Sequence, residues 1–153
     1  MNVDLEIVSR AKLGALEAAV SRTAYALYSG PIRKGIFLLS LECNSYPKDA
    51  DTAVIKLCAA VEALGDDERR LWDRALKRTF DVGYALMAGS RVAHVSLRPE
   101  TLKRVTALGA SIAFTCYLEG NDDPGLPMNG SEPISSKSHP QSSLVCPGHG
   151  SRC

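Results

Sequence analysis

Two segments that alternate with a period of two residues, separated by a helical pattern, constrain the fold of this chain more than any other feature. The segments are TFDVGYALM and ASIAFTCYL, and the helical pattern RPETLKRVTALG between them begins at Pro99 and ends at Gly109. Strands joined through a helix favour parallel neighbours with a right-handed crossover. The helix should therefore cover one face of a small sheet.

The two alternating segments also predict which face of that sheet is apolar. The apolar face carries Phe80, Val82, Tyr84, Leu86, Ile112, Phe114, Cys116 and Leu118. The opposite, mixed face carries Thr79, Asp81, Gly83, Ala85, Ser111, Ala113, Thr115 and Tyr117. We expect the mixed face to be open, or to be covered by the first helix or by a partner.

The first half of the chain supplies the remaining elements. Over residues 1–30, Ala and Leu recur at three- and four-residue steps before a Gly-Pro pair, which predicts an N-terminal helix. The stretch KGIFLLSLEC predicts a strand at the centre of the sheet. Two helices follow, the first capped by Asp49 or Asp51 and the second, over residues 67–78, with Trp72 on its buried side.

These elements predict an α+β fold with two layers, in which a small mixed or parallel sheet has helices on one face. The domain should span residues 1–118, with the N-terminal helix over 1–30 and a strand-helix-helix-strand-helix-strand order over 35–118. In the last 35 residues, 17 are Pro, Gly or Ser, and large apolar residues are few. Such a segment cannot bury enough surface to offset its ordering entropy, so residues 119–153 are predicted to be a disordered tail.

Charge and cysteine content narrow the classes of partner. Lys plus Arg total 18 and Asp plus Glu total 17, which gives no electrostatic argument for nucleic acid or an anionic membrane as the main partner. The longest strongly apolar run is IFLL, and the N-terminal residues lack a secretory pattern, so neither a membrane span nor export is predicted. The 5 cysteines form no C-x-x-C pair, which fits a reducing cytoplasm.

Two segments carry a family resemblance. LWDRALKRTFDVGYALMAG and VSLRPETLKRVTALGASIAFTCYL resemble the second half of a bacterial family, the domain of unknown function numbered 4279. The shared features are a helix, a strand, a Leu-x-Pro-Glu-x-Leu helix start and a final strand that ends in an aromatic residue. The resemblance covers residues 36–118. It implies a fold and a bacterial origin but no mechanism, and it leaves the predicted helix over 1–30 unexplained, since members of that family usually open on a strand.

The C-terminal residues raise the question of a zinc site. The candidate ligands are His139, Cys146, His149 and Cys153, which are suitable ligand types for a tetrahedral site. Their spacing matches no paired-knuckle pattern, and without flanking strands or helices the metal would have to supply all of the ordering energy. We therefore reject this metal site and assign no cofactor.

Polar residues at the junction of a helix and a strand are the best candidates for binding. Asp73, Arg78 and Asp81 flank the end of the predicted helix and the start of the next strand, so the chain should bring them near one sheet edge. They can also simply pair with each other. Together with Tyr117 on the mixed face, they form the predicted binding set, and no catalytic residue is assigned.

Two other function classes stay open as alternatives. A small enzyme would use Asp73, Asp81 or His94, although no phosphate-loop, dinucleotide, zincin or hydrolase motif occurs. A weak nucleic-acid binder would use the basic face of the helix over 67–78, although an Asp73 to Lys77 pairing should interrupt that face.

The preferred prediction is a cytoplasmic, non-catalytic domain that binds another protein through the mixed face and its edge, as an immunity-type or regulatory adaptor protein does. A homodimer through the sheet edge is a further option, whereas membrane and nucleic acid are not predicted partners.

Overall fold

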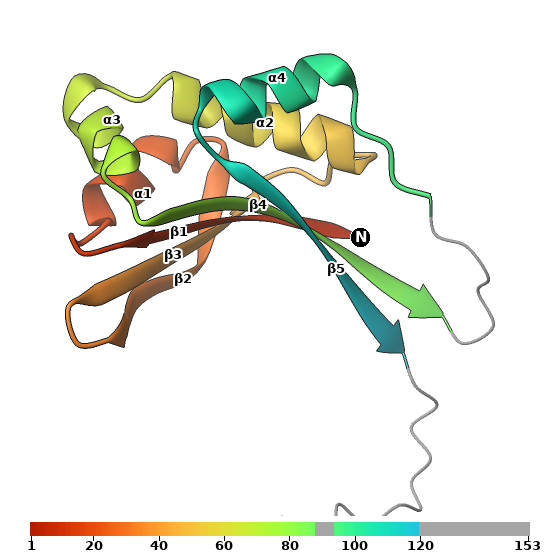
Figure 1. The fold of residues 1–153 in the computed structure, drawn as a ribbon, viewed down its shortest axis with the longest axis horizontal. Helices are drawn as coiled ribbons and strands as arrows, with labels where there is room; N and C mark the ends of the chain where they lie inside the picture. Colours follow the sequence, from red (N-terminus) through yellow and green to blue (C-terminus); the bar gives the residue numbers. More distant parts are fainter. Residues whose placement is uncertain (88–93, 120–153) are drawn as a thin grey trace, which may run out of the picture. The chain divides into compact units, whose positions relative to one another are not determined.

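The computed structural model of the protein describes residues 1–87 and 94–119, all within one compact unit, Met1–Asn121. The described residues form 5 strands and 4 helices (Figure 1). In chain order they are β1 (Asn2–Ser9), α1 (Gly14–Val20), β2 (Ala24–Arg33), β3 (Ile36–Cys43), α2 (Ala50–Glu62), α3 (Asp66–Asp73), β4 (Lys77–Met87), α4 (Pro99–Ala107) and β5 (Ser111–Glu119). Residues 120–153, with the rejected zinc ligands and nearly all of the predicted tail, lie outside the described residues.

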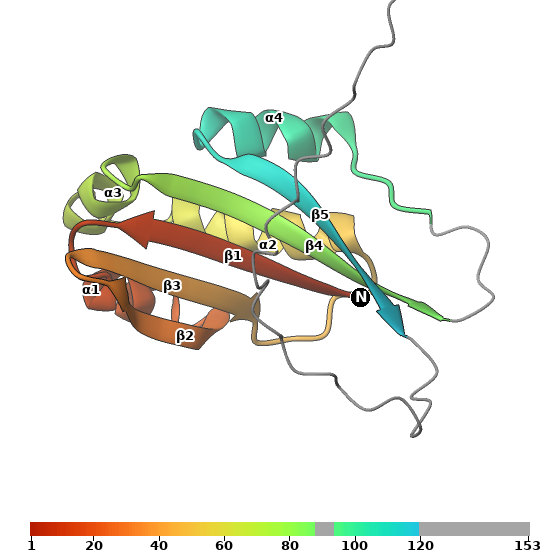
Figure 2. The ribbon, with the colours of Figure 1, turned by 60° about the horizontal axis from the view of Figure 1, so that its bottom comes forward.

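The strands form one mixed sheet in the order β2-β3-β1-β4-β5 (Figure 2). Neighbouring strands are antiparallel except for β4 and β5, which are parallel and joined through α4. The α+β class and the parallel pairing of the two alternating segments are thus confirmed. Strand β3, predicted to be central, is an internal strand between β2 and β1, but the middle position of the sheet belongs to β1.

The described helices all lie on one face of the sheet (Figure 1), which confirms the two-layer arrangement. Val3, Leu5 and Ile7 of β1 point into this layer and are almost completely buried. Trp72 of α3 is fully buried, as its helical periodicity predicted, and its indole Nε1 donates a 2.9 Å hydrogen bond to the carbonyl oxygen of Leu108 at the end of α4. The core therefore lies between the sheet and the helices.

The predicted helix over residues 1–30 is wrong. That segment contains two strands, β1 and β2, and only the short helix α1 between them. The segment NVDLEIVS alternates apolar and polar residues, so as a strand it buries one side completely. The Ala-rich stretch after it has helical periodicity. The sequence prediction wrongly continued this periodicity through the residues of β1. Burial of one face of β1 in the sheet decides the outcome.

The predicted helix over 67–78 is too long. Helix α3 ends at Asp73, and β4 begins at Lys77 because Lys77 pairs with Val8 of β1 in the sheet. The predicted pairing of Asp73 with Lys77 is also wrong, since Lys77 forms an ion pair with Glu6 of β1 at 3.1 Å. The basic residues of the segment are therefore divided between a helix and a strand.

None of the described helices is long and apolar enough to cross a membrane.

Candidate functional site on the open face of the sheet

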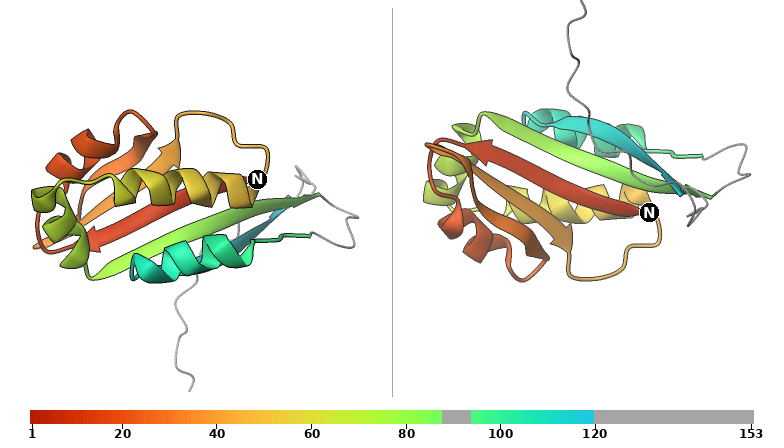
Figure 3. Two further views of the ribbon diagram at one scale, coloured as in Figure 1. Left: turned by 90° about the horizontal axis from the view of Figure 1, so that it is seen from above. Right: turned by 90° about the horizontal axis from the view of Figure 1, so that it is seen from below.

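The side of the sheet away from the helices carries no helix in residues 1–87 and 94–119, as the view from below shows (Figure 3, right). We call this side the open face. It carries the even-numbered residues of β1, whose odd-numbered neighbours are buried under the helices. By register it also carries the odd-numbered residues of β4 and β5, which are the predicted mixed face. Of the two covers that the sequence suggested for this face, the first helix is excluded, because α1 packs on the other side (Figure 1).

Three carboxylates stand side by side across the middle of the open face. Asp4 of β1 lies directly opposite Glu42 of β3 on one side and Asp81 of β4 on the other. We call Glu42, Asp4 and Asp81 the acidic row. Like charges directly opposite each other on neighbouring strands destabilise a sheet. The acidic row therefore costs stability in the isolated protein.

Asp4, at the centre of the row, is the least satisfied of the three. Burial, together with the nearby carboxylates of Glu42, Asp81 and Glu6, raises the pKa of Asp4 to about 6. Asn2 donates a 3.2 Å hydrogen bond to Asp4 Oδ2, but the buried Oδ1 accepts none from the described residues. At neutral pH this side chain is therefore largely ionised, with one oxygen unpartnered.

The outer members of the row each have a hydroxyl donor. Tyr25 of β2 donates a 2.5 Å hydrogen bond to Glu42 Oε2, and this bond raises the pKa of the tyrosine to about 12. On the other side, Thr115 of β5 lies 2.8 and 2.9 Å from the two carboxylate oxygens of Asp81. The row is thus held in place from both edges of the sheet. The described residues contain no group of three or more His, Cys, Asp or Glu side chains placed to bind a metal ion.

Gly83 of β4 shapes the open face next to the row. A Cβ atom at this position would lie 2.0 Å from Asn2 Oδ1 and 3.3 Å from Tyr117 Cε2. Any larger residue would displace Asn2, which donates to Asp4. The ring of Tyr117 lies beside this position and is 54% exposed. The glycine therefore allows Asn2 and Tyr117 to lie close over β4.

The acidic row leads to a prediction about stability. Asp4→Asn removes the central charge and should raise the free energy of unfolding at pH 7 by roughly 1 kcal/mol. Because the pKa of Asp4 in the folded protein lies above its ordinary value, the wild type should gain stability as the pH falls through about 6. Asp4→Asn should lack this gain. Urea unfolding at neutral and mildly acidic pH measures both effects.

Asp67→Asn is the matched control, because Asp67 is an exposed acid of α3 paired with Arg70 at 2.7 Å. This substitution should leave the pH dependence near pH 6 unchanged. A loss of stability in Asp4→Asn at pH 7 would contradict the destabilising role of the row.

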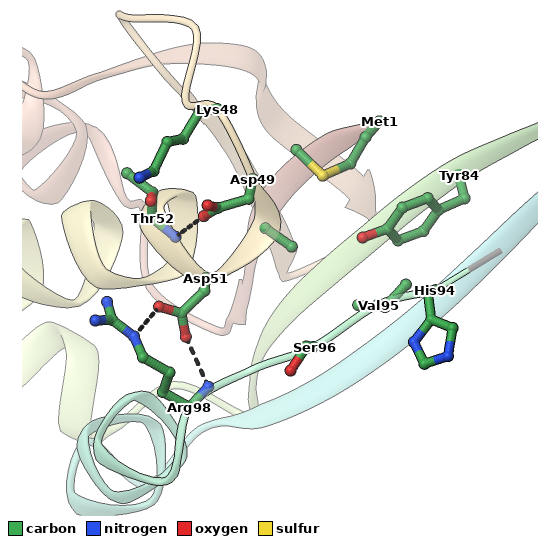
Figure 4. Close-up of a pocket in the computed structure, with 11 residues that line it drawn as sticks. Met1, Lys48, Asp49, Asp51, Thr52, Tyr84, His94, Val95, Ser96 and Arg98 are labelled. Atoms are coloured by element: carbon green, nitrogen blue, oxygen red, sulfur yellow. Dashed lines mark hydrogen bonds and ion pairs between the residues drawn. The ribbon is translucent and has the colours of Figure 1, made fainter.

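A second candidate site is a cavity of about 610 Å³ on the helix side of the sheet (Figure 4). It lies beside the N-termini of α2 and α4, and its volume is in the range of small-molecule sites. Its polar lining includes Lys48, Asp49, Asp51, Tyr84, His94 and Arg98.

The two carboxylates of this cavity are engaged in holding helix ends. Asp49 caps α2 by accepting a 2.7 Å hydrogen bond from the main-chain N–H of Thr52, as the sequence predicted for one of its two candidate caps. Asp51, which is buried, accepts from the main-chain N–H of Arg98 at 2.8 Å, from its Nε at 2.6 Å and from Thr101 Oγ1 at 2.6 Å. Although burial opposes it, these hydrogen bonds hold the pKa of Asp51 below its ordinary value. Both carboxylates thus have structural roles.

The structure divides the predicted group of Asp73, Arg78 and Asp81 between the two sides of the sheet. The Arg78 guanidinium lies on the helix side, 5.9 Å from the centre of the Trp72 ring, and donates to the carbonyl oxygen of Asp73 at 3.2 Å. The Asp73 carboxylate pairs instead with Arg69 of its own helix at 3.2 Å. Asp81 belongs to the open face, on the opposite side of the sheet. Arg78 thus lies beside Asp73, but the prediction that Asp81 joins them near one edge is wrong.

The other predicted residues fall into two places. Tyr117 shares the open face with Asp81, one strand away. His94 lines the cavity on the helix side. Asp73, Asp81 and His94, the candidates for an enzyme, are thus divided among the end of α3, the open face and the cavity.

Sequence reasoning missed Asp4, Glu42 and Tyr25. Asp4 lies in the strand that was taken for a helix, and the alternation of Val3, Leu5 and Ile7 around it is the signal that could have identified it. Glu42 and Tyr25 can be placed beside Asp4 only when the strand register is known.

Comparison of the chain with protein-family models, with curated proteins and with solved structures found no match. The resemblance to the domain of unknown function 4279 therefore stays a prediction.

Proposed function

We propose that the protein is a non-catalytic binding domain whose open face contacts a basic surface of another protein. The observation that supports this most is the acidic row, where like charges oppose each other and Asp4 has a buried, unpartnered oxygen. An immunity-type or regulatory adaptor role, a bacterial origin and a cytoplasmic location belong to the same proposal. The free buried thiols of Cys43 and Cys58 are consistent with a reducing compartment.

The acidic row has different energies in the free and the bound protein. In the free protein, the repulsion within the row and the unpartnered oxygen of Asp4 both oppose folding. A lysine or arginine of a partner, placed over the row, would relieve both effects at once. Residues that lower stability but improve binding are typical of functional sites. The proposal therefore explains why the row is present at all.

Exposed tyrosines on the same side of the sheet supply contact area. Tyr25, Tyr28 and Tyr117 are 47%, 43% and 54% exposed, and by register they stand on β2 and β5, on either side of the row. Tyrosine is enriched in protein interfaces because a large apolar ring carries a polar end. The arrangement is a charged centre with aromatic flanks.

The test is capture of partners from a lysate of the source cell, using the full chain as bait. Asp4→Asn combined with Asp81→Asn should reduce recovery of a partner about tenfold or more, equivalent to about 1.4 kcal/mol. Asp66→Asn combined with Asp67→Asn, two exposed acids of α3, changes the net charge equally and should retain the partner. Capture should also weaken as salt is raised.

A partner recovered equally with both double variants would contradict the role of the open face. Absence of any partner on the wild-type bait would contradict the binding function itself.

A further inference from the structure

The two edge strands of the sheet differ in how they are protected against pairing with another strand. Edge strand β2 contains Pro31, which has no main-chain N–H to donate. Its ladder with β3 also shifts register between Ala26 and Tyr28 and again between Pro31 and Arg33. Prolines, irregularities and charges are the features by which natural edge strands resist the addition of a further strand. The β2 edge is therefore protected.

Edge strand β5 lacks these features along its length up to Leu118, and its one charged residue is the last, Glu119. Residues 111–118 include no Pro, no Gly and no charged side chain. The ladder with β4 runs without a register shift from Ser111 to Glu119, and the outer edge has no strand partner in the described part of the chain. Phe114 is 57% exposed on this strand, although its side of the sheet carries the helices. An edge of this kind is a template for a further strand.

We infer that the β5 edge is the interface of a homodimer, in which β5 pairs antiparallel with β5 of a second copy. A twofold axis perpendicular to the sheet makes the same strand antiparallel to itself, so each copy supplies both halves of the pairing. The register with Phe114 on the axis places Ile112 opposite Cys116 of the second copy and Ala113 opposite Thr115. Apolar residues then meet on the helix side, and on the open face the small residues Ala113 and Thr115 are flanked by Ser111 opposite Tyr117.

Charge favours a second copy as the occupant. Because residues 111–117 carry no charge, self-pairing places no like charges opposite each other, the arrangement that penalises a sheet pair. The chain as a whole has a formal net charge of only +1, so two copies do not repel strongly. The same axis keeps both helix layers on one side. The two open faces then form one continuous surface.

The mass of the full chain in solution tests this inference. Sedimentation equilibrium from about 1 µM to about 1 mM detects a dimer whose dissociation free energy is as low as about 4 kcal/mol. The wild type should show twice the mass of one chain. Phe114→Lys puts a charge at the axis and should reduce the species to one chain. Circular dichroism should show unchanged secondary structure, since Phe114 is largely exposed.

Ile32→Lys is the matched control, because Ile32 is a similarly exposed apolar residue, at 52%, on the opposite edge strand β2. It should remain dimeric. A wild type that is monomeric throughout, or a dimer that persists in Phe114→Lys but dissociates in Ile32→Lys, would overturn the inference.

A cross-link tests the register without disrupting the pairing, and so decides the question even if Phe114→Lys unfolds. In a chain with Cys146→Ser and Cys153→Ser, the further change Ile112→Cys places a thiol opposite the exposed Cys116 of the second copy. Oxidised glutathione should then join the two sulfur atoms as it is reduced to two thiols, and a covalent dimer should appear on a non-reducing gel. Adding Cys116→Ser should abolish it. No cross-link with Cys116 present would overturn the inferred pairing.

Discussion

Trp72→Ala should lower the free energy of unfolding by about 3–5 kcal/mol, the cost of truncating a fully buried large aromatic side chain. Three contacts are lost together: the packing in the core, the hydrogen bond to the carbonyl oxygen of Leu108 and the contact with the Arg78 guanidinium. Denaturant unfolding followed by circular dichroism measures the change. An unfolding midpoint close to that of the wild type would contradict the position of Trp72 in the core.

Trp72→Phe separates these contributions. It keeps most of the apolar surface but leaves the Leu108 carbonyl oxygen without its indole donor. The expected loss is about 1–3 kcal/mol, the cost of an unsatisfied buried acceptor. A loss as large as that of the alanine variant would show that the retained ring contributes little, and that the hydrogen bond to the Leu108 carbonyl oxygen holds α3 against the end of α4.

Asp51→Ala should lower the free energy of unfolding by about 2–4 kcal/mol. Its carboxylate joins α2 to the start of α4, and without it the hydroxyl of Thr101, which is fully buried, and the main-chain N–H of Arg98 lose their acceptor. Asp49→Ala is the control, because Asp49 is an exposed cap of the same helix and its loss should cost about 1 kcal/mol. Equal losses in the two variants would contradict the role of Asp51 as a link between helices.

The pH dependence of the free energy of unfolding gives an independent measure of how much the Asp51 carboxylate stabilises the fold. Since the pKa of Asp51 is lowered in the folded protein, its contribution is fully present above the ordinary aspartate value of 3.8 and is lost as the pH falls through the folded value. Wild-type stability should therefore fall in this acidic range more steeply than that of Asp51→Asn. If the stability of the wild type and of Asp51→Asn fell equally steeply with pH, the stabilising role of the ionised Asp51 carboxylate would be contradicted. The Asp4 carboxyl acts in the opposite direction and at higher pH, so the two can be distinguished.

The sequence predicted the fold most accurately where one pattern occupied a whole element. The alternating segments became β4 and β5 with the expected parallel pairing, and Pro99 and Gly109 bound the helix between them as predicted. The prediction for the N-terminal residues was wrong because two patterns lie next to each other there. Alternation over β1 is followed at once by the Ala-rich residues of α1, and periodicity alone did not separate them.

The candidate site was less predictable than the fold because its residues come together only through the strand register. Asp81 and Tyr117 were identified on one face by alternation within their own strands. That Asp4 would stand between Asp81 and Glu42 depends on β1 lying between β3 and β4, which is a property of the whole sheet. The link from Asp51 to Thr101 likewise joins helices far apart in the chain.

The central position of β1 has a consequence for how the chain folds during synthesis. Of the five strands, β1 leaves the ribosome before the others and can pair with β3 soon after β3 emerges, but its other edge must wait for β4. At roughly 5–20 residues per second, the segment between the end of β3 and the end of β4 takes a few seconds to be made. During that interval the edge of β1 that will face β4 is unpaired, and Val3, Leu5 and Ile7 are covered only once α2 packs on β1. The nascent chain is then most exposed to aggregation, and most dependent on chaperones, after β3 has emerged and before β4 has.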